Sequence, residues 1–159
     1  MISRARMPGK RMNNISYTPI GVVHSPHTLP AQTPKQTESA RGIAATVEID
    51  PAYAAGLKDI EGFSYLWLLV HMHAANSVTL QVSTVRGEPP LGVFATRGPF
   101  RPNPIGLSLV RLVRVEGNVL HIEDIDLLDG TPVLDIKPYV PLLDQREGVL
   151  SGWYQRHLH

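Results

Sequence analysis

The sequence contains no cysteine, which excludes disulfide frameworks, thiolate zinc sites and cysteine nucleophiles. It also has no apolar run close to the roughly 20 residues of a membrane span, and its N-terminus lacks the apolar core of a signal peptide. A chain without thiols is compatible with a reducing compartment. We therefore expect a cytoplasmic protein that does not associate with membranes.

Several familiar motifs are missing as well. The sequence has no Walker loop, no GxGxxG after a predicted strand, no HExxH and no GxSxG. These absences disfavour P-loop NTPases, doubly wound dinucleotide enzymes, zincins and α/β-hydrolases. What remains is a chain of 159 residues, 43% of them hydrophobic, which is enough for one domain with a proper core.

The domain boundaries follow from composition. Residues 1–14 carry four cations and no acid, which predicts a disordered basic arm. We expect one domain over residues 15–145 and a C-terminal tail over 146–159.

The apolar pattern is that of an all-β protein. Strands are expected over residues 15–24, 43–49, 63–73, 78–85, 108–115, 119–125 and 133–141. Residues 50–57 form a short helix in this prediction, with Asp50 as the N-cap and Pro51 in the first turn. The segment 63–73 is apolar on both faces, which indicates a central strand. Many short strands with frequent turns indicate a closed barrel or a sandwich.

Residues 92–107 contain three prolines, three glycines and the arginines Arg97 and Arg101. Such a density of proline and glycine gives a loop with a defined shape rather than a helix or a central strand. Two guanidinium groups held on this loop suit a carboxylate or phosphate ligand. A structural turn with solvated arginines explains the pattern equally well.

Charged residues are unevenly distributed after this point. Five arginines and one acid lie between residues 86 and 115, whereas eight acids and two cations lie between 116 and 147. This asymmetry indicates either an anion-binding face beside an acidic one, or two solvated faces. Asp126, Asp129 and Asp135 occur among apolar residues, where acids need partners. They either form an internal ion-pair network or bind a ligand.

A metal site is not expected. His71 and His73 would share one face of the strand over 63–73, but no third histidine or carboxylate pattern accompanies them. A polar end to a core strand is the favoured interpretation. His73 stands where the apolar run stops, so it is placed to reach a ligand.

Five blocks carry a resemblance to a known family: PIGVVHSP (19–26), GFSYLW (62–67), GVFATR (92–97), RPNPIGLS (101–108) and DLLDGTPVLDIKPY (126–139). Together they resemble the TsaA-like family, whose members include the TrmO-type, or YaeB-like, tRNA methyltransferases. The likeness runs from about residue 15 to about residue 144. This sequence differs from the family pattern at Lys35, Ala74 and Gly98. The resemblance does not include the C-terminal extension of longer members.

The resemblance implies a closed antiparallel β-barrel with one or two short helices, and a homodimer that binds S-adenosyl-L-methionine (SAM). The implied reaction methylates the exocyclic nitrogen of a threonylcarbamoyl-modified adenine 3′ of a tRNA anticodon. By motif, cofactor binding falls on Gln36, Thr37, Glu38, Ser39, His73, Ala74, Arg97, Leu107, Glu123, Asp124, Ile125 and Asp126.

Other roles follow from the same resemblance and from residue chemistry. The candidates for the methyl-acceptor side are Asp126, Asp129, Asp135, Lys137 and Tyr139. Contacts with RNA phosphates are predicted for Arg101, Arg111, Arg114 and Lys137. Two alternatives stay open at this point: a methyltransferase with a small-molecule acceptor, and a non-catalytic dimeric module that binds SAM or RNA.

Overall fold

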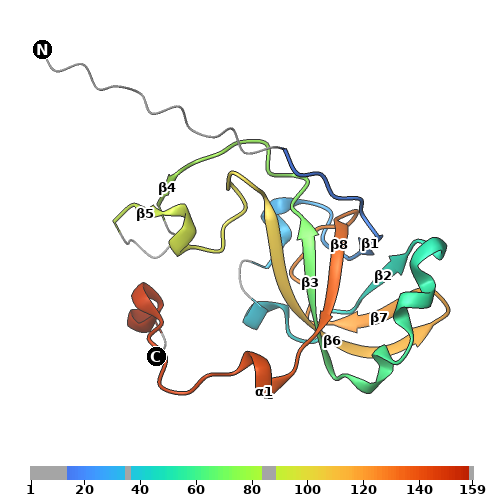
Figure 1. Cartoon of the computed structure of the whole chain (residues 1–159). Coiled ribbons are helices and arrows are strands. Elements are labelled where there is room, and N and C mark those ends of the chain that lie inside the picture. The colour runs from blue at the N-terminus through green and yellow to red at the C-terminus, as the bar shows by residue number, and fades with distance from the viewer. Residues whose placement is uncertain (1–13, 35–36, 84–88, 158–159) are drawn as a thin grey trace, which may run out of the picture.

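The computed structural model describes residues 14–34, 37–83 and 89–157 (Figure 1). Its centre is a closed, antiparallel six-stranded barrel with the strand order β1-β2-β7-β6-β3-β8. The strands are β1 (Gly21–His24), β2 (Ala45–Ile49), β3 (Tyr65–His71), β6 (Ile105–Glu116), β7 (Val119–Glu123) and β8 (Pro132–Pro138). The predicted all-β, closed-barrel architecture is confirmed.

A small lobe lies beside the barrel (Figure 1). It contains the two-stranded sheet of β4 (Gln81–Val82) and β5 (Leu91–Gly92), the 3-10 turn η5 (Val93–Ala95) and the loop up to residue 104. The remaining helical elements are η1 (Pro30–Gln32), η2 (Thr37–Ala40), η3 (Pro51–Leu57), η4 (Ile60–Gly62), α1 (Pro141–Asp144) and η6 (Gly152–His157). Among the described residues, none of the helices has the length and apolar character needed to cross a membrane.

The alternation of side chains along β3 shows how the core forms. Leu66, Leu68 and Val70 point into the barrel and are fully buried, whereas Tyr65 and Trp67 lie on its outer face and are half-buried. The interior is completed by aliphatic side chains from the other strands and from the chain after β7: Val23, Val47, Ile49, Val110, Leu112, Leu120, Ile122, Ile125, Leu127 and Val133. Because the outer face of β3 is also largely apolar, the sequence showed no clear alternation there.

Some predicted elements are shorter than expected. The first strand begins at Gly21 instead of residue 15, and only Gln81 and Val82 of the expected strand over 78–85 pair in a sheet. The helix over residues 50–57 is a 3-10 helix, η3, which runs to Leu57. Its predicted cap is confirmed, because the backbone N–H of Ala52 donates to Asp50 Oδ1 at 2.8 Å.

Strand β1 packs so closely on β2 that it needs glycine at residue 21. A Cβ atom there would stand 2.4 Å from the backbone oxygen of Glu48. We expect Gly21→Ala to destabilise the fold by roughly 1 to 3 kcal/mol, because the backbones must separate. Thermal unfolding measures the change. Gly56→Ala is the matched control, since nothing lies within 4 Å of its Cβ position; equal melting temperatures of the two variants would contradict the prediction.

Candidate functional site

The antiparallel order brings three connections to the same end of the barrel: β1 to β2, β3 to β6, and β7 to β8. Most of the residues predicted to bind a cofactor lie on these connections or at the adjoining strand ends. They are Thr37, Glu38, Ser39, His73, Ala74, Arg97, Glu123, Asp124, Ile125 and Asp126. Gln36 lies outside the described residues, and Leu107 is near the start of β6, half exposed on its outer side.

The chain leaves β7 through an unusual backbone conformation. Asp124 has a φ of 69°, a left-handed value that residues other than glycine adopt infrequently. Its Oδ1 accepts a hydrogen bond of 2.8 Å from the backbone N–H of Gly42, and the N–H of Ile125 donates to the oxygen of Ile43. These contacts join the chain after η2 to the segment after β7.

A second set of hydrogen bonds fixes the same segment from the side of β1. The Ser25 hydroxyl donates to the oxygen of Leu127 at 2.7 Å, and Nε2 of His27 lies 3.2 Å from the oxygen of Ile125. The acceptor is a carbonyl, so Nε2 carries the proton. His27 is only 8% exposed. Neither role was predictable from the sequence, since both residues lie in an irregular polar loop.

Asp126 is part-buried at this end of the barrel. Its Oδ1 accepts a hydrogen bond of 2.7 Å from the hydroxyl of Ser108, which lies on the buried face of β6. Burial raises the pKa of Asp126, while the hydrogen bond from Ser108 and the charges of His27 and Arg97 act in the opposite direction. Arg97 is therefore within electrostatic reach of Asp126. We call Arg97, Ser108 and Asp126 the barrel-end site.

Arg101 and Arg97 lie on the same loop but differ in their surroundings. Nη1 of Arg101 donates to the oxygens of Val93, Thr96 and Gly98 at 3.1, 2.8 and 3.3 Å, and its guanidinium lies 5.8 Å from the ring centre of Phe94. Arg97 is exposed, and within the described part of the chain its guanidinium forms no hydrogen bond or ion pair. Arg101 thus braces the loop, and Arg97 remains available to a ligand.

The structure separates the residues predicted for the methyl-acceptor side. Asp126 belongs to the barrel-end site. Asp129 accepts a hydrogen bond from the backbone N–H of Ser25 at 3.1 Å. Asp135 and Lys137 form an ion pair of 2.9 Å on the outer face of β8, and Tyr139 packs against aromatic rings of β3. These five side chains do not converge on one point.

The other predicted RNA-contacting cations also have partners within the chain. Arg111 pairs with Glu123, and Arg114 pairs with Glu116 at 2.9 Å. The Arg114–Glu116 pair is exposed and therefore weak, whereas the Arg111–Glu123 pair is part-buried. The RNA contacts stay predictions. Within the described ranges, no three histidine, aspartate or glutamate side chains are placed to share a metal ion.

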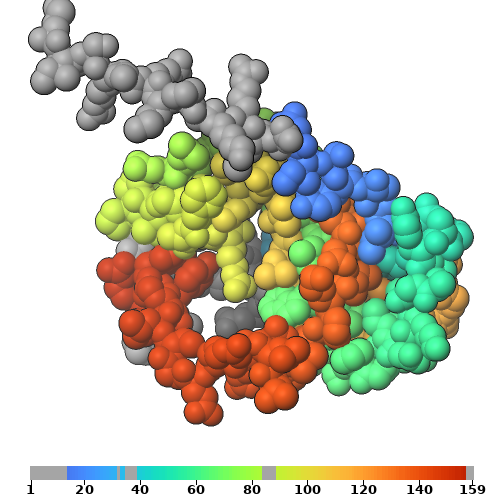
Figure 2. All heavy atoms as spheres, viewed as in Figure 1, coloured from blue at the N-terminus to red at the C-terminus, as the bar shows by residue number. Residues whose placement is uncertain are grey.

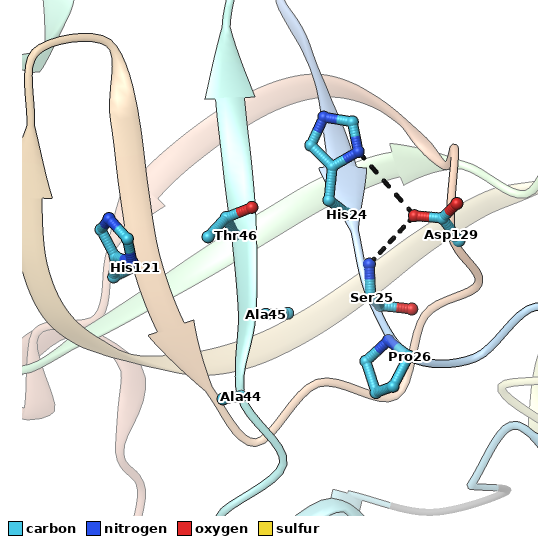
Figure 3. A pocket seen from close by; sticks show the side chains of 8 residues that line it. All are labelled: His24, Ser25, Pro26, Ala44, Ala45, Thr46, His121 and Asp129. Carbon is cyan, nitrogen blue, oxygen red and sulfur yellow. Dashed lines mark hydrogen bonds and ion pairs between the residues drawn. The ribbon is translucent and has the colours of Figure 1, made fainter.

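A shallow depression of about 490 Å³ lies on the outside of the barrel (Figure 3). His24 and Asp129 lie on one side of β2 and His121 on the other, and the strand between them carries Ala45 and Thr46. Nδ1 of His24 is 3.8 Å from Asp129 Oδ1, and Nε2 of His121 is 2.9 Å from Glu116. Asp129 is the only predicted site residue among those that line it, so this depression is separate from the barrel-end site.

The raised pKa of Asp126 has a consequence for stability. At neutral pH the folded protein holds a carboxylate where burial disfavours it, so Asp126→Asn should raise the melting temperature. Asparagine still accepts the hydrogen bond from Ser108. The stabilisation should shrink as the pH falls through the raised pKa and vanish below the unfolded value of about 3.9. Thermal unfolding across this pH range measures the difference; a variant that melts lower at neutral pH would contradict it.

Comparison with known proteins gives consistent matches. Residues 22–145 match the family described as the tRNA-methyltransferase O N-terminal domain. The chain is 52% identical over 145 residues to a Pyrococcus abyssi protein named "Probable S-adenosyl-L-methionine-binding protein", covering 91% of this chain and 79% of the relative. It is 36% identical over 154 residues to the Escherichia coli tRNA (adenine(37)-N6)-methyltransferase, covering 91% of this chain and 66% of that enzyme.

The solved structures agree. The crystal structure of TrmO from Pseudomonas aeruginosa superposes with a TM-score of 0.76 at 39% sequence identity. The match covers 88% of this chain and 62% of that protein. The chain therefore spans less than two thirds of the TrmO structure that it resembles.

Proposed function

The chain belongs to the family of tRNA-methyltransferase O N-terminal domains, and from this premise we propose that it binds SAM at the barrel end and methylates tRNA. The proposed acceptor is the exocyclic nitrogen of a threonylcarbamoyl-modified adenine 3′ of the anticodon. The observation that carries the proposal is the exposed guanidinium of Arg97 within electrostatic reach of the part-buried Asp126.

These residues fit the chemistry of the cofactor. Arg97 offers a guanidinium that can bind the carboxylate of a methionine moiety. Asp126 is a carboxylate acceptor suited to ribose hydroxyls, and its orientation is fixed by the bond from Ser108. When bound, SAM supplies a methyl group activated by its sulfonium. The contributions proposed for the protein are to bind and orient the reactants.

The acceptor nitrogen must lose a proton when it is methylated. Asp126 is the favoured proton acceptor among the predicted residues, because burial raises its pKa and makes it a better base than an exposed carboxylate. Asp129, Asp135, Lys137 and Tyr139 remain proposed contacts on the acceptor side. Their separation in the fold suits contacts with an extended RNA better than a single catalytic cluster.

We also propose that the chain forms a homodimer. The C-terminal segment from α1 onwards exposes large apolar side chains, including Leu142 at 88% and Leu150 at 87%. A second copy of the chain would cover such a surface. Light scattering coupled to gel filtration tests the dimer, and a cytoplasmic location stays a prediction.

Two measurements test the function. Titration calorimetry with SAM should give saturable binding to the wild-type chain, and the absence of heat together with an unchanged melting temperature would contradict the proposal. Transfer of a radiolabelled methyl group from SAM to tRNA carrying the threonylcarbamoyl modification should then be detected. Binding without transfer would favour a non-catalytic module, and transfer only to small molecules would favour the other enzyme class.

A further inference from the structure

Three aromatic side chains form a cluster on the outside of the barrel. Tyr139, at the end of β8, contacts Tyr65 and Trp67 of β3 in edge-on geometry, with ring centres 6.5 and 5.9 Å apart. All three side chains are half-buried, although the barrel core is on the other side of β3. We call Tyr65, Trp67 and Tyr139 the aromatic face.

Two cations flank the aromatic face. Strand register places Arg111 of β6 opposite Tyr65, and Lys137 of β8 opposite Trp67. Their side chains are 42% and 63% exposed. Each pairs with an acid. The Lys137–Asp135 pair is exposed and therefore weak, and the Arg111–Glu123 pair is part-buried but leaves part of the arginine side chain open to a phosphate group. Stacking surfaces flanked by cations are the means by which proteins bind unpaired nucleotides.

The surroundings of the aromatic face leave room for a ligand. Figure 2 shows an opening between the C-terminal segment, the lobe and the barrel, with green atoms of β3 near its edge. The C-terminal segment is anchored across this opening, because Nε1 of Trp153 donates to the oxygen of Ala95 in η5 at 2.8 Å. The four residue-to-residue steps from Trp67 to His71 at the barrel end span about 13 Å along the strand. A few unstacked nucleotides cover this distance.

We propose that the aromatic face stacks an unpaired base of the RNA substrate, a few nucleotides from the base that is methylated, with Arg111 and Lys137 contacting the adjoining phosphates. The inference rests on the proposed function and adds a separate RNA-binding surface to it. A second copy of the chain is a poorer occupant, because lysine is depleted and charge is rare at the centres of protein interfaces. Bases and phosphates match both the rings and the cations.

The experiment uses the fluorescence of Trp67, which is one of two tryptophans in the chain. Full-length wild-type protein is titrated with a synthetic anticodon stem-loop RNA at low and moderate salt. Stacking should quench the emission of the wild type. Trp67→Phe should bind with affinity within about threefold of wild type but lose most of the quenching, whereas Trp67→Leu should lose about tenfold or more in affinity. Lys137→Gln should weaken binding and reduce its salt dependence.

SAM titration of the same variants separates this inference from the proposed function. Unchanged SAM affinity with impaired RNA binding supports the aromatic face. RNA binding that neither quenches Trp67 nor weakens in Trp67→Leu overturns it, as does a lack of RNA binding by a wild type that still binds SAM. In the absence of RNA, emission that changes with protein concentration in the wild type but not in Trp67→Phe would assign this face to contact between copies, and also overturns it. If Trp67→Leu does not fold, the quenching measured with the wild type and with Trp67→Phe decides between these outcomes.

Discussion

Arg97→Ala should weaken SAM binding by about 10- to 100-fold. Hydrogen bonds to a charged group contribute roughly 1.5 to 3 kcal/mol, and removal of the guanidinium removes them from the ligand. The side chain is exposed on a loop that Arg101 braces, so its loss should leave the barrel intact. Titration calorimetry gives the affinity, and thermal unfolding without ligand verifies the fold.

Two further variants serve as comparisons for the SAM affinity of Arg97→Ala. Arg97→Lys keeps the charge but loses the bidentate geometry, so its affinity should fall between the wild type and Arg97→Ala. Arg114→Ala removes an exposed arginine from the opposite end of β6 and should leave SAM affinity unchanged. Wild-type affinity in Arg97→Ala would remove this residue from the site.

Arg101→Gln should also weaken SAM binding substantially, because it destabilises the loop that holds Arg97. The arginine donates to three backbone oxygens within the loop, and their loss should cost roughly 3 kcal/mol of local stability. We expect faster amide hydrogen exchange over residues 93–104 and weaker SAM binding, because Arg97 loses its fixed position. The barrel amides should exchange as in the wild type.

The matched control is Arg114→Gln, which removes one exposed ion pair with Glu116. Exposed pairs contribute about 0 to 1 kcal/mol, so hydrogen exchange of the loop should not change. Normal loop protection in Arg101→Gln would show that prolines and backbone hydrogen bonds suffice to hold the loop, and would remove the bracing role.

Strand patterns and turn residues made much of the fold predictable from the sequence. The strands predicted over 108–115 and 119–125 leave only three residues between them, and the structure joins β6 to β7 there by a tight turn in which Gly117 has a φ of 60°. The next predicted strand begins at residue 133, and the chain turns before it at Gly130, which has a φ of 74°. Closure of the barrel depends on the pairing of β1 with β8, more than 100 residues apart along the chain. No local pattern specifies such a pairing, and only the family resemblance implied it.

The candidate site was predictable in part. Arg97 and Asp126 were named from the sequence, and the structure brings them within electrostatic reach. Ser108 was missed, although a serine on the buried face of an apolar strand is a signal that could have found it. His27 gave no signal, because its role depends on a long-range contact with the oxygen of Ile125.

For the residues predicted to contact the methyl acceptor, the sequence suggested a cluster that the structure does not contain. Asp135 and Lys137 are two residues apart in β8, so both point to the outside of the barrel. Asp126 lies beyond the end of β7 and bonds to Ser108 on the inner face of β6. Closeness in the sequence suggested one cluster of acids, but strand alternation assigns these side chains to different faces.

The central claim is that SAM binds at the barrel-end site, and a crystal structure of the full chain grown with SAM tests it most directly. We predict ligand density in contact with the Arg97 guanidinium and the Asp126 carboxylate, at the end of the barrel where β7 leads into β8. Density in the depression beside His24 and His121 instead, or no bound ligand at saturating SAM, would contradict the account.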